Sequence, residues 1–117
     1  MKSKKKPNQS CCMPALLKEE NDLRPVEGAA ADEELAVFAK AIGHPIRVRI
    51  LRMLSHREAR VCSEIVNEFP LAQSTVSEHL RILKEAGLVR SSCSGTKIGY
   101  CIEASAMRRM KALAASL

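Results

Sequence analysis

The sequence predicts a mainly α-helical fold with one small β-hairpin, and three observations lead to this prediction. Apolar residues recur at helical spacing within residues 71–87, where Val76, Leu80 and Leu83 stand at i, i+4 and i+7. Alternating apolar residues after Gly87 are typical of two short paired strands. The length of 117 residues, with 46% apolar and 27% charged side chains, suits one globular domain with a single modest core.

The chain divides into an N-terminal arm, residues 1–31, and a folded domain, residues 32–117. Lysines, prolines and a run of small residues at 28–31 predict that the arm is flexible, and its one chemically pointed feature is the adjacent pair Cys11 and Cys12. The domain is predicted to begin with a helix that Asp32 caps and Gly43 ends. The expected buried face of this helix consists of Leu35, Phe38, Ala39 and Ile42.

Two further helices lead into residues 71–87. His44 serves the junction, and Pro45 opens the next helix at a position where its missing N–H costs nothing. The inward residues of that helix are predicted to be Ile46, Ile50, Leu51, Met53 and Leu54, and the outward residues Arg47, Arg49, Arg52 and Arg57. Ser63 then caps a short helix that ends before Pro70. This short helix, a turn at residues 70–73 and the longer polar-faced helix make up a helix-turn-helix pattern.

The remainder of the chain predicts a hairpin and a last helix. The first strand begins at Leu88, and Ser94 and Gly95 form the tip of the hairpin. The residues of the returning strand that face the core are predicted to be Ile98, Tyr100 and Ile102. The apolar side of the last helix, which begins near Ser105, comprises Met107, Met110, Leu113 and Leu117. Because the first and last helices expose more apolar surface than so small a fold covers, we expect a symmetric homodimer built on them.

The net charge of +6 is unevenly distributed along the chain. Residues 1–39 hold six basic and seven acidic side chains, or −1, whereas residues 40–117 hold thirteen and six, or +7. Because the basic part also has the strong periodicities, the charge favours a polyanionic partner such as DNA. Phe38, Phe69 and Tyr100 are the only aromatic residues, which argues against a stacking platform for single-stranded nucleic acid.

Other classes of protein are disfavoured. No stretch reaches the roughly 18 apolar residues of a membrane span, and no sustained apolar run follows the basic start. We therefore expect a cytoplasmic protein whose five cysteines are mostly reduced. A thiol-dependent arsenate reductase or phosphatase would need a phosphate cradle beside a reactive cysteine. Since no cysteine is followed by an arginine six residues later, we expect no enzyme activity.

The helix at residues 71–87 has a second face, opposite its apolar stripe. The polar and charged residues off the stripe are Gln73, Ser74, Ser77, Glu78, Arg81 and Lys84. Such a face suits a DNA major groove, where the N-terminal residues of a helix reach base edges and its basic residues meet phosphates. An ordinary solvated face is the alternative reading of the same residues.

These elements in this order constitute a winged helix-turn-helix, and the chain resembles the ArsR/SmtB family of bacterial metal-responsive repressors. The resemblance is carried by KAIGHPIRVRILRML at residues 40–54, QSTVSEHLRILKEAGLV at 73–89 and GYCI at 99–102, within about the last 80 residues. It implies a homodimer whose recognition helices enter successive major grooves of double-stranded operator DNA, with the hairpins, or wings, on the flanking backbone. The residues that we assign to DNA on this basis are Gln73, Ser74, Thr75, Ser77, Glu78, His79 and Arg81, with Lys97 on the wing.

The metal-ligating residues in the sequence indicate which inducer such a repressor would sense. Family members often carry a C-V-C-D-L motif at the third helix, whereas the local match VCSEI has only Cys62, and residues 105–117 lack the Asp and His of a zinc site. Trivalent arsenic prefers three thiolates, and soft ions select cysteine. Cys11 and Cys12 of the arm with Cys62, which the resemblance suggests can come from the partner subunit, are therefore the predicted ligands of As(III) or Sb(III) as inducer. No cofactor is expected to be obligatory.

Three alternatives to this arsenic site stay open. Cys101 can join a site with an arm cysteine, in place of Cys62. Oxidation of Cys11, Cys12 or Cys62 can replace metal binding in a redox switch of the same fold. A ligand-independent regulator is the third alternative, with Cys62 simply a small buried residue.

Cys93 at the hairpin tip and Cys101 near the base are expected to lie well over ~15 Å apart, too far to chelate one ion.

Overall fold

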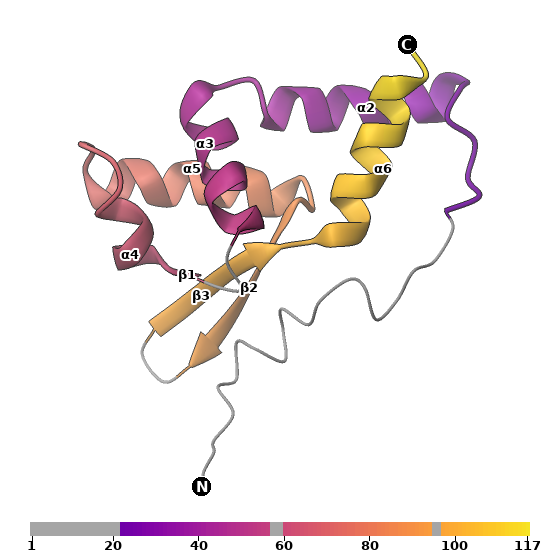
Figure 1. The fold of residues 1–117 in the computed structure, drawn as a ribbon. Coiled ribbons are helices and arrows are strands. Elements are labelled where there is room, and N and C mark those ends of the chain that lie inside the picture. The colour runs from indigo at the N-terminus through magenta and orange to yellow at the C-terminus, as the bar shows by residue number, and fades with distance from the viewer. Residues whose placement is uncertain (1–21, 57–59, 95–96) are drawn as a thin grey trace, which may run out of the picture.

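The computed structural model describes residues 22–56, 60–94 and 97–117, without the side chains of residues 60–63, 92–94, 97 and 98. Its elements are α2 (Ala29–Ala41), α3 (Pro45–Ser55), β1 (Arg60–Val61), α4 (Cys62–Val66), α5 (Gln73–Glu85), β2 (Val89–Ser94), β3 (Lys97–Ile102) and α6 (Ala104–Ala115). Figure 1 shows α2 and α6 together at one end of the molecule and the β2–β3 hairpin at the other, with α3 and α5 between them. The predicted winged helix-turn-helix, mainly helical with a small hairpin, is confirmed. None of the described helices is long and apolar enough to cross a membrane.

Helix α2 begins earlier than predicted. Gly28, with φ of 108°, is its N-cap, and Asp32 lies in the first turn instead of capping the helix. An acidic side chain there still interacts favourably with the positive end of the helix dipole. The helix ends at Ala41, before the predicted Gly43. Its buried residues are Ala31, Phe38 and Ala41, whereas Leu35 and Ile42 are half-buried and Ala39 is exposed, so the predicted face was only partly right.

Helix α3 begins where the sequence predicted. Pro45 occupies its first position, and His44 caps it by accepting a 3.1 Å hydrogen bond at Nδ1 from the N–H of Ile46. The fully buried residues are Ile50, Leu51 and Leu54, and the half-buried Ile46 and Met53 pack against them. Arg47 differs from the prediction, because its guanidinium turns toward the end of α2 instead of outward.

The sheet has three strands in the order β1–β3–β2, with both pairings antiparallel. The β2–β3 ladder runs from the Val89–Ile102 pair to the Ser94–Lys97 pair, so the predicted hairpin is confirmed, and its tip at residues 95–96 lies outside the described residues. Tyr100 packs against the core as predicted, as does Ile102. The sequence did not predict β1, because a two-residue strand shows no alternation.

The helix-turn-helix is formed by α4 and α5, which contact each other. Helix α4 spans Cys62–Val66 and is shorter than the predicted helix, which was to start at Ser63 and reach Phe69. Phe69 is nevertheless buried in the turn that follows, where it packs into the core. The last helix, α6, buries Leu113 as predicted, whereas Leu117 is 96% exposed.

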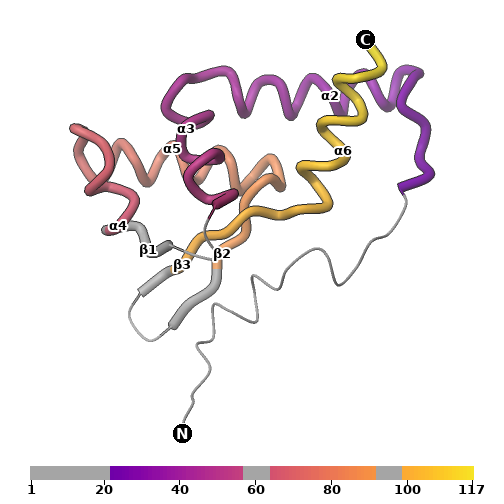
Figure 2. The backbone as a smooth tube through the Cα atoms, viewed as in Figure 1, coloured from indigo at the N-terminus to yellow at the C-terminus, as the bar shows by residue number. Residues whose placement is uncertain are grey.

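Helix α5 is fixed by its apolar stripe and by the turn that ends it. Val76, Leu80 and Leu83 are fully buried, as predicted. Gly87, with φ of 87°, donates its N–H to the Lys84 carbonyl at 2.9 Å, and the next residue donates to the Leu83 carbonyl at 3.1 Å. These two hydrogen bonds form a Schellman motif, which requires the left-handed conformation that glycine adopts without strain. The predicted stop is confirmed, and Figure 2 shows the chain passing from α5 through this turn toward β2.

Candidate nucleic-acid interface

The polar face of α5 is open to solvent, because the apolar stripe on the other side of the helix is held in the core. The exposed residues of this face are Gln73, Ser74, Thr75, Glu78 and Arg81, whereas Ser77 and His79 are half-buried. The N-cap residue, Ala72, makes no side-chain hydrogen bond to the first turn. The first N–H groups of α5 therefore keep their capacity to bind an anion such as a DNA phosphate.

Arg81 lies between two carboxylates of its own helix. Its Nε donates to Oε1 of Glu78 at 3.0 Å, and its Nη1 donates to Oε2 of Glu85 at 2.6 Å. These hydrogen bonds raise the pKa of Arg81 and hold the pKa of Glu78 below its ordinary value. Ion pairs between exposed side chains contribute only about 0.2–1 kcal/mol each. A phosphate group can therefore displace the carboxylates from Arg81.

His79 is turned partly into the protein. Its Nδ1 lies 3.2 Å from Nη1 of Arg47, and its ring centroid lies 4.5 Å from that of His44, with the planes tilted by 46°. Burial lowers the pKa of His79, as do the nearby charges of His44 and Arg47, while Glu78 opposes the shift. The neutral imidazole is therefore favoured near pH 7. This residue, which we assigned to DNA, has its described polar contact with α3.

The wing is described only in part. Lys97 begins β3, and its backbone pairs with Ser94 at the end of the ladder. Its side chain lies outside the part of the chain that the structure describes. The backbone position at the far end of the hairpin agrees with the assignment of Lys97 to the wing, and its contact with phosphate stays a prediction.

The predicted thiolate ligands also lie largely outside the description. Cys11 and Cys12 belong to residues 1–21, and Cys62 is the first residue of α4, with a side chain that is not described. Within residues 22–56, 60–94 and 97–117, no group of three or more His, Cys, Asp or Glu side chains is placed to hold a metal ion. The three-thiolate site stays a prediction.

Cys101 is an exception within the expectation that the five cysteines are mostly reduced. It is 2% exposed, and its sulfur is disulfide-bonded. Cys93 is not the partner, because it pairs with Ile98 in the ladder while Cys101 pairs with Arg90. Three ladder positions correspond to about 10 Å, beyond the Cα–Cα distance of up to about 7 Å that a disulfide spans. This separation is shorter than the 15 Å expected from the sequence, and it still prevents the two thiols from sharing one ion.

A buried arginine of α6 holds the residues that connect the arm to the domain. Arg109 is 4% exposed, and it donates to the carbonyl of Arg24 at 3.1 Å and to that of Pro25 at 2.7 Å. It also pairs with Glu34 of α2 at 2.9 Å. Contacts with the domain thus begin before residue 32, where we had placed the boundary.

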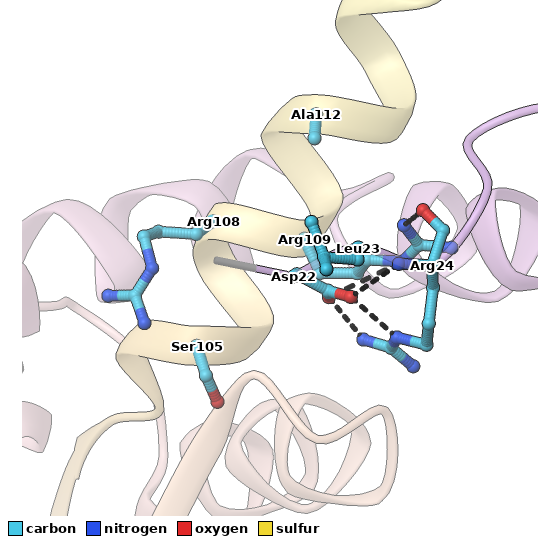
Figure 3. A pocket seen from close by; sticks show the side chains of 7 residues that line it. All are labelled: Asp22, Leu23, Arg24, Ser105, Arg108, Arg109 and Ala112. Carbon is cyan, nitrogen blue, oxygen red and sulfur yellow. Dashed lines mark hydrogen bonds and ion pairs between the residues drawn. The ribbon is translucent and has the colours of Figure 1, made fainter. Parts of the chain in front are cut away.

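The same connecting residues border a surface pocket of about 630 Å³. Its lining residues are Asp22, Leu23, Arg24, Ser105, Arg108, Arg109 and Ala112. Figure 3 shows Arg108 on the opposite side of α6 from Asp22 and Arg24, which point toward each other. The sequence held no signal for this arrangement, because RRM in α6 reads as a solvated face. Arg47 was missed for the same reason.

Comparisons with known proteins agree with this geometry. The family model for bacterial regulatory proteins of the arsR family matches residues 44–91. An uncharacterised HTH-type transcriptional regulator of Methanocaldococcus jannaschii is 39% identical over 70 residues, covering 60% of this chain and 79% of that protein. The HTH-type transcriptional repressor SmtB of Mycobacterium tuberculosis is 39% identical over 62 residues, covering 52% of this chain and 44% of that protein.

A solved structure gives the same result for the fold. The crystal structure of a possible transcriptional regulator for arsenical resistance superposes with a TM-score of 0.62 at 28% sequence identity. The superposition covers 66% of this chain and 79% of that one. The matched family region, residues 44–91, includes α3, the helix-turn-helix and the start of β2.

Proposed function

The chain belongs to the ArsR/SmtB family of DNA-binding transcriptional repressors, and we propose that trivalent arsenic, bound by cysteine thiolates, releases its homodimer from operator DNA. DNA binding is supported by the solvent-exposed polar face of α5. The N-terminus of this helix has no side-chain cap. Gln73, Ser74 and Thr75 lie in the first turn, where a recognition helix reaches base edges. The free N–H groups and Arg81 contact phosphates.

The homodimer is built on α2 and α6. Two apolar side chains support this assignment, since Val37 of α2 is 54% exposed and Leu117 after α6 is 96% exposed. Both helices lie at the end of the molecule away from the wing (Figure 1), so pairing them leaves the wings and α5 free for DNA. A two-fold axis there presents two recognition helices to major grooves about 34 Å apart along the duplex.

The thiolates of Cys11, Cys12 and Cys62 are soft, negatively charged ligands, which suit trivalent arsenic. Arsenous acid reacts with three cysteine thiols to form three As–S bonds and release three waters, with no change of oxidation state. Cys12 lies ten positions before Asp22, which allows the arm a reach of at most about 36 Å from its attachment. This attachment is firm, because Arg109 binds the backbone of Arg24 and Pro25.

Cys62 couples arsenic binding to DNA binding. It is the first residue of α4, the helix that packs against α5 within the helix-turn-helix. A thiolate bound there changes the position of α4 and with it that of α5. Arsenic then shifts the population toward a state that does not fit DNA, and a hundredfold release requires about 2.7 kcal/mol of coupling between the two sites.

A thiol redox switch is the second candidate, and the disulfide of Cys101 favours it. Formation of a disulfide from two thiols passes two electrons and two protons to an oxidant. The redox switch oxidises the same thiols that the arsenic site uses, Cys11, Cys12 and Cys62. The two candidates therefore compete for cysteines and must be compared on fully reduced protein.

Intact-protein mass spectrometry distinguishes the two. For the arsenic proposal, arsenite raises the mass of the reduced subunit by one arsenic atom less three hydrogens, and three cysteines resist alkylation. Cys93→Ser, the matched control, behaves in the same way, whereas Cys62→Ser retains arsenic weakly. If oxidant removes two hydrogens from the subunit and arsenite gives no arsenic adduct, the arsenic proposal fails and the redox switch is supported.

A further inference from the structure

Arg47 joins three helices at the back of the DNA-facing helix. Its Nε donates to the carbonyl of Ala41 at 2.5 Å, its Nη2 lies 3.5 Å from the carbonyl of Lys40, and its Nη1 lies 3.2 Å from Nδ1 of His79. Ala41 is the last residue of α2, so its carbonyl is among those that a helix leaves unsatisfied at its negative end. One planar guanidinium thus binds the end of α2 and the middle of α5 at a fixed angle.

We propose that Arg47 is a positioning residue for DNA binding, which sets the orientation of the recognition helix α5 relative to α2. The inference concerns DNA binding by the family fold and does not depend on which ligand is the inducer. In a dimer built on α2, the angle between α2 and α5 sets the spacing of the two recognition helices. A guanidinium that holds both helices controls that spacing without touching DNA.

The geometry also fixes the proton of His79. An arginine side chain carries only donors, so Nδ1 of His79 accepts and the ring proton lies on Nε2. His44 supports the ring from the side of α3, because its own Nδ1 accepts from Ile46 and its ring lies 4.5 Å from that of His79. Burial, His44 and Arg47 all lower the pKa of His79 and so disfavour a second proton on its ring, whereas Glu78 raises this pKa.

The competing role for Arg47 is direct contact with a DNA phosphate, and substitution separates the two roles. Lysine keeps the positive charge and serves a phosphate, but a single ammonium group does not reproduce the planar fork. If Arg47 is a positioning residue, Arg47→Lys and Arg47→Gln both weaken DNA binding about tenfold. Each substitution loses a hydrogen bond that the charged guanidinium makes. For a phosphate contact, Arg47→Lys retains affinity.

The experiment measures fluorescence anisotropy of the full chain on operator DNA over a range of salt concentrations. Arg52→Gln is the matched control, because Arg52 is an exposed arginine of the same helix with the same change of charge. We expect the salt dependence of Arg47→Lys to equal that of wild type while affinity falls. Restored affinity in Arg47→Lys, or a salt slope for Arg47→Gln reduced by about one relative to the control, would overturn the proposal.

Two further measurements keep the test valid if an Arg47 variant folds poorly. Nitrogen NMR of wild type is expected to show His79 with its proton on Nε2, and a proton on Nδ1 contradicts the bridge. In a double-mutant cycle, Arg47→Gln and His79→Gln together are expected to weaken DNA binding no more than either alone. Additive losses would mean that Arg47 does not act through His79.

Discussion

Arg109 of α6 and Glu34 of α2 form an ion pair of 2.9 Å in which the arginine side chain is 4% exposed and the glutamate 28%. The same guanidinium donates to the backbone carbonyls of Arg24 and Pro25. One buried charge thus joins both proposed dimer helices to the base of the arm. A buried charge is tolerated only when its donors are satisfied, so each of these partners supports the others.

Glu34→Gln is expected to destabilise the fold. The amide keeps the shape of the side chain but removes the nearer of the two carboxylates that pair with the buried guanidinium of Arg109, leaving Asp22 at 3.9 Å. Loss of one partner of a fully buried pair costs about 3–5 kcal/mol, and partial exposure of Glu34 reduces this to about 1–3 kcal/mol of unfolding free energy. Urea denaturation measures the change. The neighbouring exposed Glu33→Gln serves as control and should stay within about 0.5 kcal/mol. Equal effects of the two would contradict this role of the pair.

The contribution of Glu34 should depend on pH. Hydrogen bonds from Arg109 hold the pKa of Glu34 below its ordinary value of 4.5. The folded protein therefore releases this proton more readily than the unfolded chain, so the stabilisation is complete above 4.5 and is lost as pH falls through the lower folded value. Unfolding free energies of wild type and Glu34→Gln should converge when urea titrations are repeated from neutral to acid pH. A constant difference would show that the charge of Glu34 is not responsible.

Gly87→Ala should destabilise the end of the recognition helix. At φ of 87° no atom lies within 4 Å of an added Cβ, so the cost comes from the backbone conformation and is about 1–2 kcal/mol. For a domain of this size, each kcal/mol lowers Tm by about 4–8 °C in a thermal melt. Gly87→Asn is the control, since asparagine tolerates the left-handed region better. A Tm of Gly87→Ala above that of wild type would contradict the Schellman turn.

Glu78→Gln should strengthen DNA binding if Arg81 contacts phosphate. The substitution removes a like charge from the DNA-facing side and frees Arg81 from one carboxylate. Since an exposed ion pair contributes up to about 1 kcal/mol, we expect affinity to rise severalfold in an anisotropy titration. Glu85→Gln, which removes the other partner of Arg81, provides the comparison. Weaker and less specific binding for Glu78→Gln alone would instead assign Glu78 to a base contact.

Periodicity and local chemistry made much of the fold predictable. The stripe of Val76, Leu80 and Leu83 follows from helical spacing, and the stop at Gly87 follows from the conformation that glycine alone adopts cheaply. The cap at His44 was marked by the proline after it. The polar face of α5 was predictable because it consists of the residues of the helix that do not belong to the apolar stripe.

The unpredicted features depend on contacts between distant segments. Arg109 and Glu34 are 75 residues apart, and a hydrophobicity pattern places both outside. Arg47 was assigned outward for the same reason, although its partners are a helix-end carbonyl and a histidine of another helix. β1 owes its existence to pairing with β3, since two residues carry no periodicity of their own. By contrast, the pairing of Arg81 with Glu78 and Glu85 was already present in their i, i+3 and i, i+4 spacing.

Arsenite-dependent release from DNA is the behaviour that a thiolate-based arsenic sensor must show. Fluorescence anisotropy follows the fully reduced chain on DNA from upstream of its own gene, with and without stoichiometric arsenite, for wild type, Cys62→Ser and the control Cys93→Ser. We expect arsenite to release wild type and Cys93→Ser from DNA while Cys62→Ser stays bound. Wild type that remains on DNA with arsenite, or Cys62→Ser that is released equally well, would contradict the arsenic proposal.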